Sequence, residues 1–468
     1  MEKLIVILLP ILLALPIRKI KKQWIHLYAI MLSTVTSLLV FCLLFNSGET
    51  YDFLSFSSEL TLSLCFDGLG KYFASIVSFL YPLTAIYAWE YMEDDSDPAS
   101  FYLFFLIAYG ITLGVGMSAN FFTLYCFYEL LTLSTMPLVL HLKDERSYEA
   151  AKTYILISIG GASLVFLCLV YILSHPDPTP GGLTQLFYIL GFFGFGVKAA
   201  VFPLHSWLPK ASCAVTPVTA LLHAVAVVKS GVFAIIRLTY YIFPITAVKG
   251  TLGQTIPLIF VIFTIFYGSS MAVKETHFKR RMAYSTVANL SYILFGILLM
   301  SQDGFIAGLL HMSFHAFIKI LAFFAVGSIM HHTGKEYLYE LDGLGKVMPF
   351  TFLFYTIAAL SLTGIPPFAG FVSKAYLLLA GIGDHSVLGF TGSLILIVSA
   401  LLTAINSFSP FIRAFFSNKT TQADHKEAGL RMLIPMGILA VLVLICGLKG
   451  DLFLSWIKDI YLSLEVWS

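Results

Sequence analysis

Five ionisable side chains lie within stretches of sequence that are apolar enough to cross a membrane. They are one acid and four lysines: Glu129, Lys198, Lys229, Lys319 and Lys374. A charged group at mid-membrane costs about 2.5 kcal/mol or more, so such residues usually face a wet, protein-lined interior and serve transport. Lysine suits a proton relay because burial favours its neutral amine, while a nearby carboxylate favours its ammonium form. We expect Glu129 to exert this control on Lys198.

Each of these assignments has a plainer alternative. Lys319 and Lys374 could snorkel to the membrane surface if the true helix ends lie closer to them than the predicted boundaries. Glu129 could neutralise one lysine permanently without taking part in transport. A single pair would be structural, whereas a row of such residues favours translocation.

Four histidines form a second polar set, and two of them share a helix face with a lysine. His205 and His223 flank the first two lysines, while His311, His315 and Lys319 recur at i, i+4 and i+8. Imidazoles titrate near neutral pH and can pass protons through intervening water. Zinc is the competing interpretation of the i, i+4 histidines, but HMSFH lacks the glutamate of a zinc protease and no third ligand is near. We therefore predict no metal site.

Glycine and proline mark two places where transmembrane helices should break. The first is KAAVFPLHSWLP, with Pro203, and the second is SLTGIPPFAGFVSK, with Gly364, Pro366 and Pro367. Proline removes an amide donor, and irregular backbone at membrane depth is tolerated only where protein or water satisfies it. Broken helices at corresponding positions of two halves indicate an inverted-repeat transporter with its ion site at the breaks.

These residues must be positioned by membrane helices. The chain is 58% hydrophobic and 12% charged over 468 residues, which leaves too little polar surface for a soluble protein. We predict an all-α polytopic membrane protein, one domain over residues 1–468, with two inverted five-helix repeats near residues 101–237 and 254–412 and flanking helices in 3–89 and 430–449. The apolar runs predict about fourteen spans, at residues 3–17, 24–46, 67–89, 101–117, 120–140, 152–174, 184–206, 214–237, 254–273, 283–300, 304–330, 349–379, 387–412 and 430–449.

Composition also excludes several classes of function. A net charge of +2 does not favour nucleic-acid binding, and the six cysteines are scattered singly. The chain has no cysteine pair, dinucleotide fingerprint or phosphate loop, so we expect no cofactor in it. Lys and Arg gather in alternate loops, which predicts an inner (cytoplasmic) membrane protein with both termini outside. His331 and His332 are expected in a loop.

The order of these motifs resembles the antiporter-like subunits of respiratory complex I, of membrane-bound hydrogenases and of Mrp-type sodium/proton antiporters. The resemblance covers roughly residues 60 to 415. It rests on YELL around Glu129, KAAVFPLHSWLPKASCAVTPVTALLHAVAVVKSGVF around Lys198 and Lys229, HMSFHAFIKILAFFAVGSI around Lys319, and GLGKVMPFTFLFYTIAALSLTGIPPFAGFVSK before and at Lys374.

The resemblance implies a role for each residue. Glu129 and Lys198 would form the driving pair, Lys229 would be the bridging lysine, Lys319 the central lysine and Lys374 the terminal one. Tyr128 stands where many relatives have tryptophan, a change expected to alter packing more than chemistry.

The implied function is ion translocation, of protons in the first instance, as one subunit of a larger complex. That complex would be either a redox-driven pump with a peripheral redox arm or an Mrp-type antiporter, built with other antiporter-like and small hydrophobic subunits. No mid-membrane aspartate offers a hard oxygen ligand for sodium, so sodium would bind in a partner or at an interface. The alternatives are a membrane-embedded transferase, which would gather its ionisable residues at one interface, and a structural subunit without transport.

Overall fold

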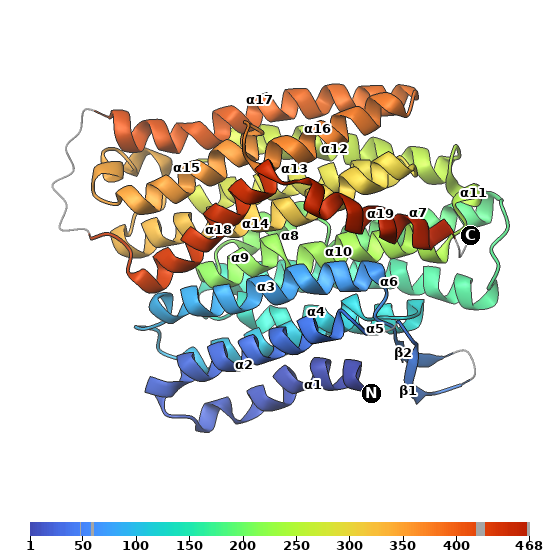
Figure 1. Ribbon diagram of the computed structural model, residues 1–468, viewed down its shortest axis with the longest axis horizontal. Coiled ribbons are helices and arrows are strands. Elements are labelled where there is room, and N and C mark those ends of the chain that lie inside the picture. The colour runs from blue at the N-terminus through green and yellow to red at the C-terminus, as the bar shows by residue number, and fades with distance from the viewer. Residues whose placement is uncertain (47, 58–59, 418–425, 466–468) are drawn as a thin grey trace.

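Helices make up most of the described chain, which comprises residues 1–46, 48–57, 60–417 and 426–465 of a computed structural model. They run along a common direction and form one bundle (Figure 1). The helices of the first half are α1 (Glu2–Ala14), α2 (Lys22–Leu43), α3 (Gly68–Tyr91), α4 (Pro98–Gly116), α5 (Phe121–Val139), α6 (Glu145–Ser174), α7 (Gly182–Gly196), α8 (Trp207–Ala211), α9 (Thr216–Ala224) and α10 (Ala226–Arg237). Those of the second half are α11 (Ile245–Val248), α12 (Leu252–Lys274), α13 (Phe278–Leu298), α14 (Gln302–Thr333), α15 (Pro349–Thr363), α16 (Ala369–Gly383), α17 (Val387–Phe416), α18 (Leu430–Leu448) and α19 (Asp451–Glu465).

The prediction of a helical, polytopic membrane protein is confirmed, apart from a short β-hairpin that the sequence did not predict. Within the described residues, ten helices are long and apolar enough to cross a membrane. Three shorter apolar helices, α7, α15 and α16, belong to spans that the sequence predicted to be broken. Each of the fourteen predicted spans coincides with one helix or with a broken pair, and α19 follows the last of them.

Side-chain caps set where many of these helices begin. Asp67, Asp97, Asn120, Asp144 and Ser301 each accept a hydrogen bond from the backbone N–H three residues later. These bonds satisfy amides that have no partner inside the helix. The short polar sequences between apolar runs thus determine the helix boundaries.

The bundle has two distinguishable ends. The strands β1 (Tyr51–Ser55) and β2 (Thr61–Leu64) form an antiparallel hairpin, with Tyr51 opposite Leu64, near the N-terminus. We call this the hairpin end, at the right of Figure 1. The opposite end, called the basic end, carries the short 3-10 helix Leu15–Lys19 between α1 and α2 and the turn from α12 to α13.

Two segments lie deep inside the bundle. Every residue is buried in the most apolar window of α14 and in the most apolar window of the stretch from Thr216 to Ile242, which contains α9 and α10. By contrast α17 exposes Leu394, Ile397 and Leu401 on its outer side. The buried lysines and histidines of α10 and α14 are therefore shielded from lipid by surrounding helices.

A buried ion pair fastens the hairpin end. Arg237, the last residue of α10, donates to both carboxylate oxygens of Asp67 at 2.6 Å. Asp67 also caps α3 by accepting from Gly70. A bidentate arginine–carboxylate pair fixes geometry as well as charge, so α3 and α10 are held in register at this end. At the other end, His331 and His332 belong to the last turn of α14, so the expectation of a loop there was wrong.

Candidate functional site

The first predicted break interrupts the helix at Lys198. α7 ends at Gly196, and helical structure resumes with the 3-10 turn Leu204–Ser206 that leads into α8. The Trp207 indole donates to the Val197 carbonyl over 2.7 Å, which satisfies one acceptor exposed by the break. Pro203 lies in the intervening segment, as the sequence predicted.

Lys198 is held by Tyr128 of α5. Its Nζ donates to the Tyr128 backbone carbonyl and lies 3.3 Å from the centroid of the Tyr128 ring. The next residue, Glu129, is half-buried, and its Oε1 has no hydrogen-bond partner among the described residues. Among the described residues, Glu129 and Lys198 do not form an ion pair. The structure thus brings the two predicted partners to adjacent positions without direct contact.

His205 lies between this break and the basic end. Its ring stacks on Phe202 with centroids 5.5 Å apart, and its Nδ1 has no partner among the described residues. The side chain lines a cavity of about 620 Å³ that also meets Glu275 and His277. Burial, with the nearby Arg280 charge, lowers the pKa of His277, so this imidazole is neutral at neutral pH.

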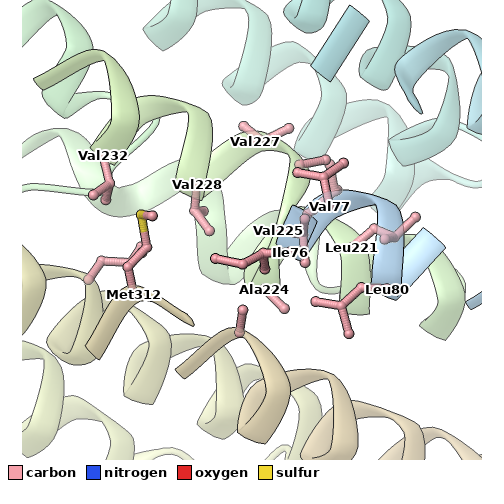
Figure 2. Packing of buried hydrophobic residues seen from close by; sticks show 14 of the residues in the cluster. Ile76, Val77, Leu80, Leu221, Ala224, Val225, Val227, Val228, Val232 and Met312 are labelled. Atoms are coloured by element: carbon pink, nitrogen blue, oxygen red, sulfur yellow. The ribbon is translucent and has the colours of Figure 1, made fainter. Parts of the chain in front are cut away.

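A second interruption separates α9 from α10 at Val225, whose φ is −137° and ψ is −66°. Figure 2 shows apolar side chains of α3, α9, α10 and α14 gathered around it, among them Val77, Leu221 and Met312. One turn after the break, Lys229 lies 2.6 Å from His315 Nδ1 of α14. The two side chains are 1% and 0% exposed, so this contact is sealed within the bundle.

His223 and Lys319 also lie in the buried core. Neither ring nitrogen of His223 has a hydrogen-bond partner among the described residues, and the ring packs against Phe323 at 4.9 Å. Lys319 donates to the Met282 carbonyl of α13 over 3.0 Å. Since Lys319 is fully buried, snorkelling to the surface is wrong for it.

The second predicted break lies between α15 and α16. α15 ends at Thr363 and is capped by Gly364, which adopts a left-handed conformation with φ of 93°. α16 starts at Ala369, so Pro366 and Pro367 occupy the gap. Lys374 donates to the Leu362 carbonyl at 2.5 Å, an acceptor without a partner inside α15. This lysine therefore faces the break, as the sequence predicted.

His311 connects the two regions. Its Nδ1 lies 2.9 Å from the Ser373 hydroxyl, next to Lys374, and its Nε2 lies 3.3 Å from Asn289 Oδ1. The His311 and His315 rings stack with centroids 5.8 Å apart. Lys229, His315, His311 and Ser373 thus form a polar row that leads to Lys374, with close contacts from Lys229 to His315 and from His311 to Ser373 and ring stacking between the two histidines.

Backbone packing joins Lys198 to this row. A Cβ added to Gly231 of α10 would stand 2.5 Å from the Ala199 amide nitrogen, so α10 lies directly against the broken segment. Lys229 is two residues before this contact. All five predicted ionisable residues therefore belong to one connected region across α5, α10, α14 and the two breaks.

Sequence reasoning missed several groups that contact the predicted residues: the side chains of Ser373 and Asn289 and the backbone carbonyls of Tyr128, Met282 and Leu362. The sequence signals for two of them are present, since Asn289 is an amide within an apolar span and Ser373 adjoins Lys374. No signal could reveal the Tyr128 carbonyl, because every residue has one. Within the described residues, no three His, Cys, Asp or Glu side chains group as metal ligands do.

A model of the family described as "NADH:quinone oxidoreductase/Mrp antiporter, TM" matches residues 118–403. The chain is 32% identical over 426 residues to the Na(+)/H(+) antiporter subunit A1 of Staphylococcus aureus strain JH9. That alignment covers 83% of this chain and 53% of the relative. The chain therefore spans about half the length of the curated relative it matches.

Two solved structures share the fold. One is the Mrp complex from Dietzia sp. DQ12-45-1b, with a TM-score of 0.86 at 20% identity over 99% of this chain and 97% of that one. The other is the membrane-bound sulfane sulfur reductase, an archaeal respiratory membrane complex, with a TM-score of 0.87 at 22% identity over 98% and 97%.

Proposed function

This chain belongs to the NADH:quinone oxidoreductase/Mrp antiporter membrane family, and from that premise we propose that it is a proton-translocating, antiporter-like subunit of a multi-subunit membrane complex. The observation that carries the proposal is the buried polar row from Lys229 through His315 and His311 to Lys374. Titratable groups within hydrogen-bond or water-bridged reach can pass protons in steps. The row lies in α10, α14 and α16, away from lipid.

In this mechanism, the charges of nearby groups determine when each residue binds or releases a proton. Lys198 loses a proton when Glu129 moves away, because an isolated ammonium is costly in a low dielectric. Lys229 then receives the proton, and the histidines of α14 carry it toward Lys374. Sodium, where it is moved, binds in a partner or at a subunit interface.

We infer that a partner subunit covers the exposed side of α5. Glu129 is only half-buried within this chain, and its neighbours Leu130 and Leu133 are 44% and 65% exposed. A carboxylate facing lipid at mid-depth would be costly, so another membrane subunit is expected there. The driving partner is either a redox arm or further antiporter subunits. The basic end faces the cytoplasm, by the preference of Lys and Arg for that side.

The test is proton flux in the reconstituted complex carrying Glu129→Gln. Glutamine keeps the shape but not the charge, so the complex should assemble while proton flux falls at least tenfold. Glu145→Gln is the matched control, because Glu145 is exposed in the first turn of α6 and touches none of the row. Wild-type flux in an assembled Glu129→Gln complex would remove this residue from the pathway.

A further inference from the structure

One face of α17 is polar although the helix lies at the bundle surface. Ser399, Thr403, Asn406 and Ser407 are all at most 4% exposed. Their spacing of i, i+4, i+7 and i+8 places them on one side of the helix. The opposite side exposes apolar residues such as Leu401, at 65%.

A second polar stripe on α13 faces this one. Arg281, Ser285 and Tyr292 recur at i, i+4 and i+11 and are buried. Tyr292 donates to the Ser399 hydroxyl over 2.6 Å, and Arg281 donates from Nε and Nη2 to the Asn406 carbonyl at 3.2 Å.

Contacts at both ends show that the two antiparallel helices face each other along these stripes. We call this the α13–α17 seam, and its members are Arg281, Ser285, Tyr292, Ser399, Thr403, Asn406 and Ser407.

Several polar atoms in the seam lack hydrogen bonds. The Ser285 hydroxyl, the Ser407 hydroxyl and both amide atoms of Asn406 have no partner among the described residues. A buried polar atom that is left without a hydrogen bond destabilises the fold. Buried water commonly fills this need, and polar side chains inside a membrane protein often face a wet cavity.

The seam joins the polar row to the basic end. Where the seam meets the polar row, the Tyr292 ring lies 5.4 Å from the His311 ring and 5.3 Å from Lys374 Nζ. Where the seam meets the basic end, Arg281 donates to the Glu275 carbonyl at 2.8 Å. The side chain of Glu275 lines the 620 Å³ cavity.

We propose that the α13–α17 seam holds a file of water molecules that gives the Lys374 end of the row a proton route to the basic end, and that Arg281 closes this route. Water in the seam is independent of the function proposed above, whereas its use by protons rests on that function. Arginine is suited to closure because it stays charged and repels an approaching cation. Its guanidinium also makes five hydrogen bonds across the mouth, to the Asn406 carbonyl twice, the Val273 carbonyl, the Glu275 carbonyl and the Ser409 hydroxyl.

Water in the seam can be tested with silver ions, which are small and react with thiols only where water carries them. Thr403→Cys introduces a thiol into the seam, and Leu401→Cys introduces one at the same depth on the exposed side of α17. Both are made in the intact complex after alanine replacement of the six native cysteines. Ag⁺ is added from the basic end, and blocked thiols are counted by alkylation after denaturation.

The Arg281→Met change tests closure in the same assay. In the Arg281→Met background, the Thr403→Cys thiol should react with Ag⁺ at least tenfold faster than the Leu401→Cys thiol. The Thr403→Cys thiol should also react faster in this background than when Arg281 is present. Equal slow reaction of both thiols in both backgrounds would overturn the water file. Fast reaction of Thr403→Cys that does not depend on Arg281 would overturn the closure. Assembly is checked by native electrophoresis, and Arg281→Lys shows whether charge alone closes the seam.

Proton use is tested separately by the passive decay of an imposed pH gradient in proteoliposomes. Arg281→Met should speed decay at least fivefold, and adding Thr403→Val should reverse most of that leak. A silver-accessible seam without a leak would contradict the proton route but leave the water file standing. Loss of flux in Glu129→Gln addresses the proposed function alone, so the two failures are distinguishable.

Discussion

The Lys198 ammonium group rests on the carbonyl and ring face of Tyr128, beside Glu129. A carbonyl and an aromatic face both attract a cation without holding it permanently, in contrast to a carboxylate in direct contact. This arrangement keeps Glu129 one residue away, so that a small movement of α5 changes the charge next to Lys198. The aromatic residue at position 128 thus contacts Lys198 through both its carbonyl and its ring, and the expectation that tyrosine in place of tryptophan alters packing more than chemistry stays a prediction.

The first prediction concerns the release of a proton from Lys198. Lys198→Arg keeps the positive charge and most of the bulk, but arginine does not give up its proton under any condition a protein meets. We expect the complex to assemble with proton flux reduced at least tenfold. Flux is measured in proteoliposomes beside Lys210→Arg, which alters a lysine in α8 that is outside the row. Normal pumping by Lys198→Arg would make the lysine a fixed charge and direct attention to His223, His311 and His315.

At each of the two helix breaks, a lysine donates to a backbone carbonyl. Lys374 contacts carbonyls at the end of α15, and the Lys198 segment follows the end of α7. The broken spans run in opposite directions, since α7 starts at the hairpin end and α15 at the basic end. This opposition supports the inverted repeats near residues 101–237 and 254–412, which stay a prediction.

The second break requires a close approach of α15 and α16, which leads to a prediction. A Cβ at Gly370 would stand 1.7 Å from the Ser361 carbonyl oxygen, so Gly370→Ala must push the helices apart. We expect a loss of about 1–3 kcal/mol of stability and displacement of Lys374 from its carbonyls. Gly383→Ala in the same helix is the control, because nothing lies within 4 Å of the added methyl. Thermal unfolding of the purified complex should separate the two variants, and equal midpoints would show that this contact can relax.

At the scale of the whole molecule, the row runs across the bundle inside a shell of apolar helices. The most apolar windows of α14 and of the stretch from Thr216 to Ile242 are completely buried, while the surface helices expose Leu, Ile and Phe on the outside of the bundle. In the proposed function, protons therefore reach the row through breaks and polar seams instead of through the helix faces. The cavity at His205 and the α13–α17 seam both lead toward the basic end.

Orientation in the membrane follows from the distribution of basic residues and can be measured. Ser96→Cys places a thiol in the exposed turn between α3 and α4 at the basic end, and Ser55→Cys places one on the exposed β1 strand. A membrane-impermeant maleimide should label Ser55→Cys on intact cells and Ser96→Cys only after permeabilisation. The opposite labelling pattern would reverse the proposed orientation.

The sequence alone determined the fold class and the residues of the row. Apolar length decides which segments cross a membrane, because an unsatisfied backbone in lipid is too costly for anything but helices. A charge inside such a segment is equally visible, so Glu129 and the four lysines could be found without coordinates. The glycines and prolines of the two breaks were visible for the same reason.

Only the tertiary structure decided which of these groups touch. The Lys229–His315 contact joins residues 86 positions apart, and the Lys198 carbonyl partner lies 70 positions away. Helix periodicity determines the face of the helix on which a residue lies, but not which other helix packs against that face. The hydrophobic effect favours the burial of any apolar face against any other, so it does not select the partner. The interruption at Val225 carries no proline or glycine, and the unsatisfied atoms of the α13–α17 seam exist only because α13 and α17 pack together.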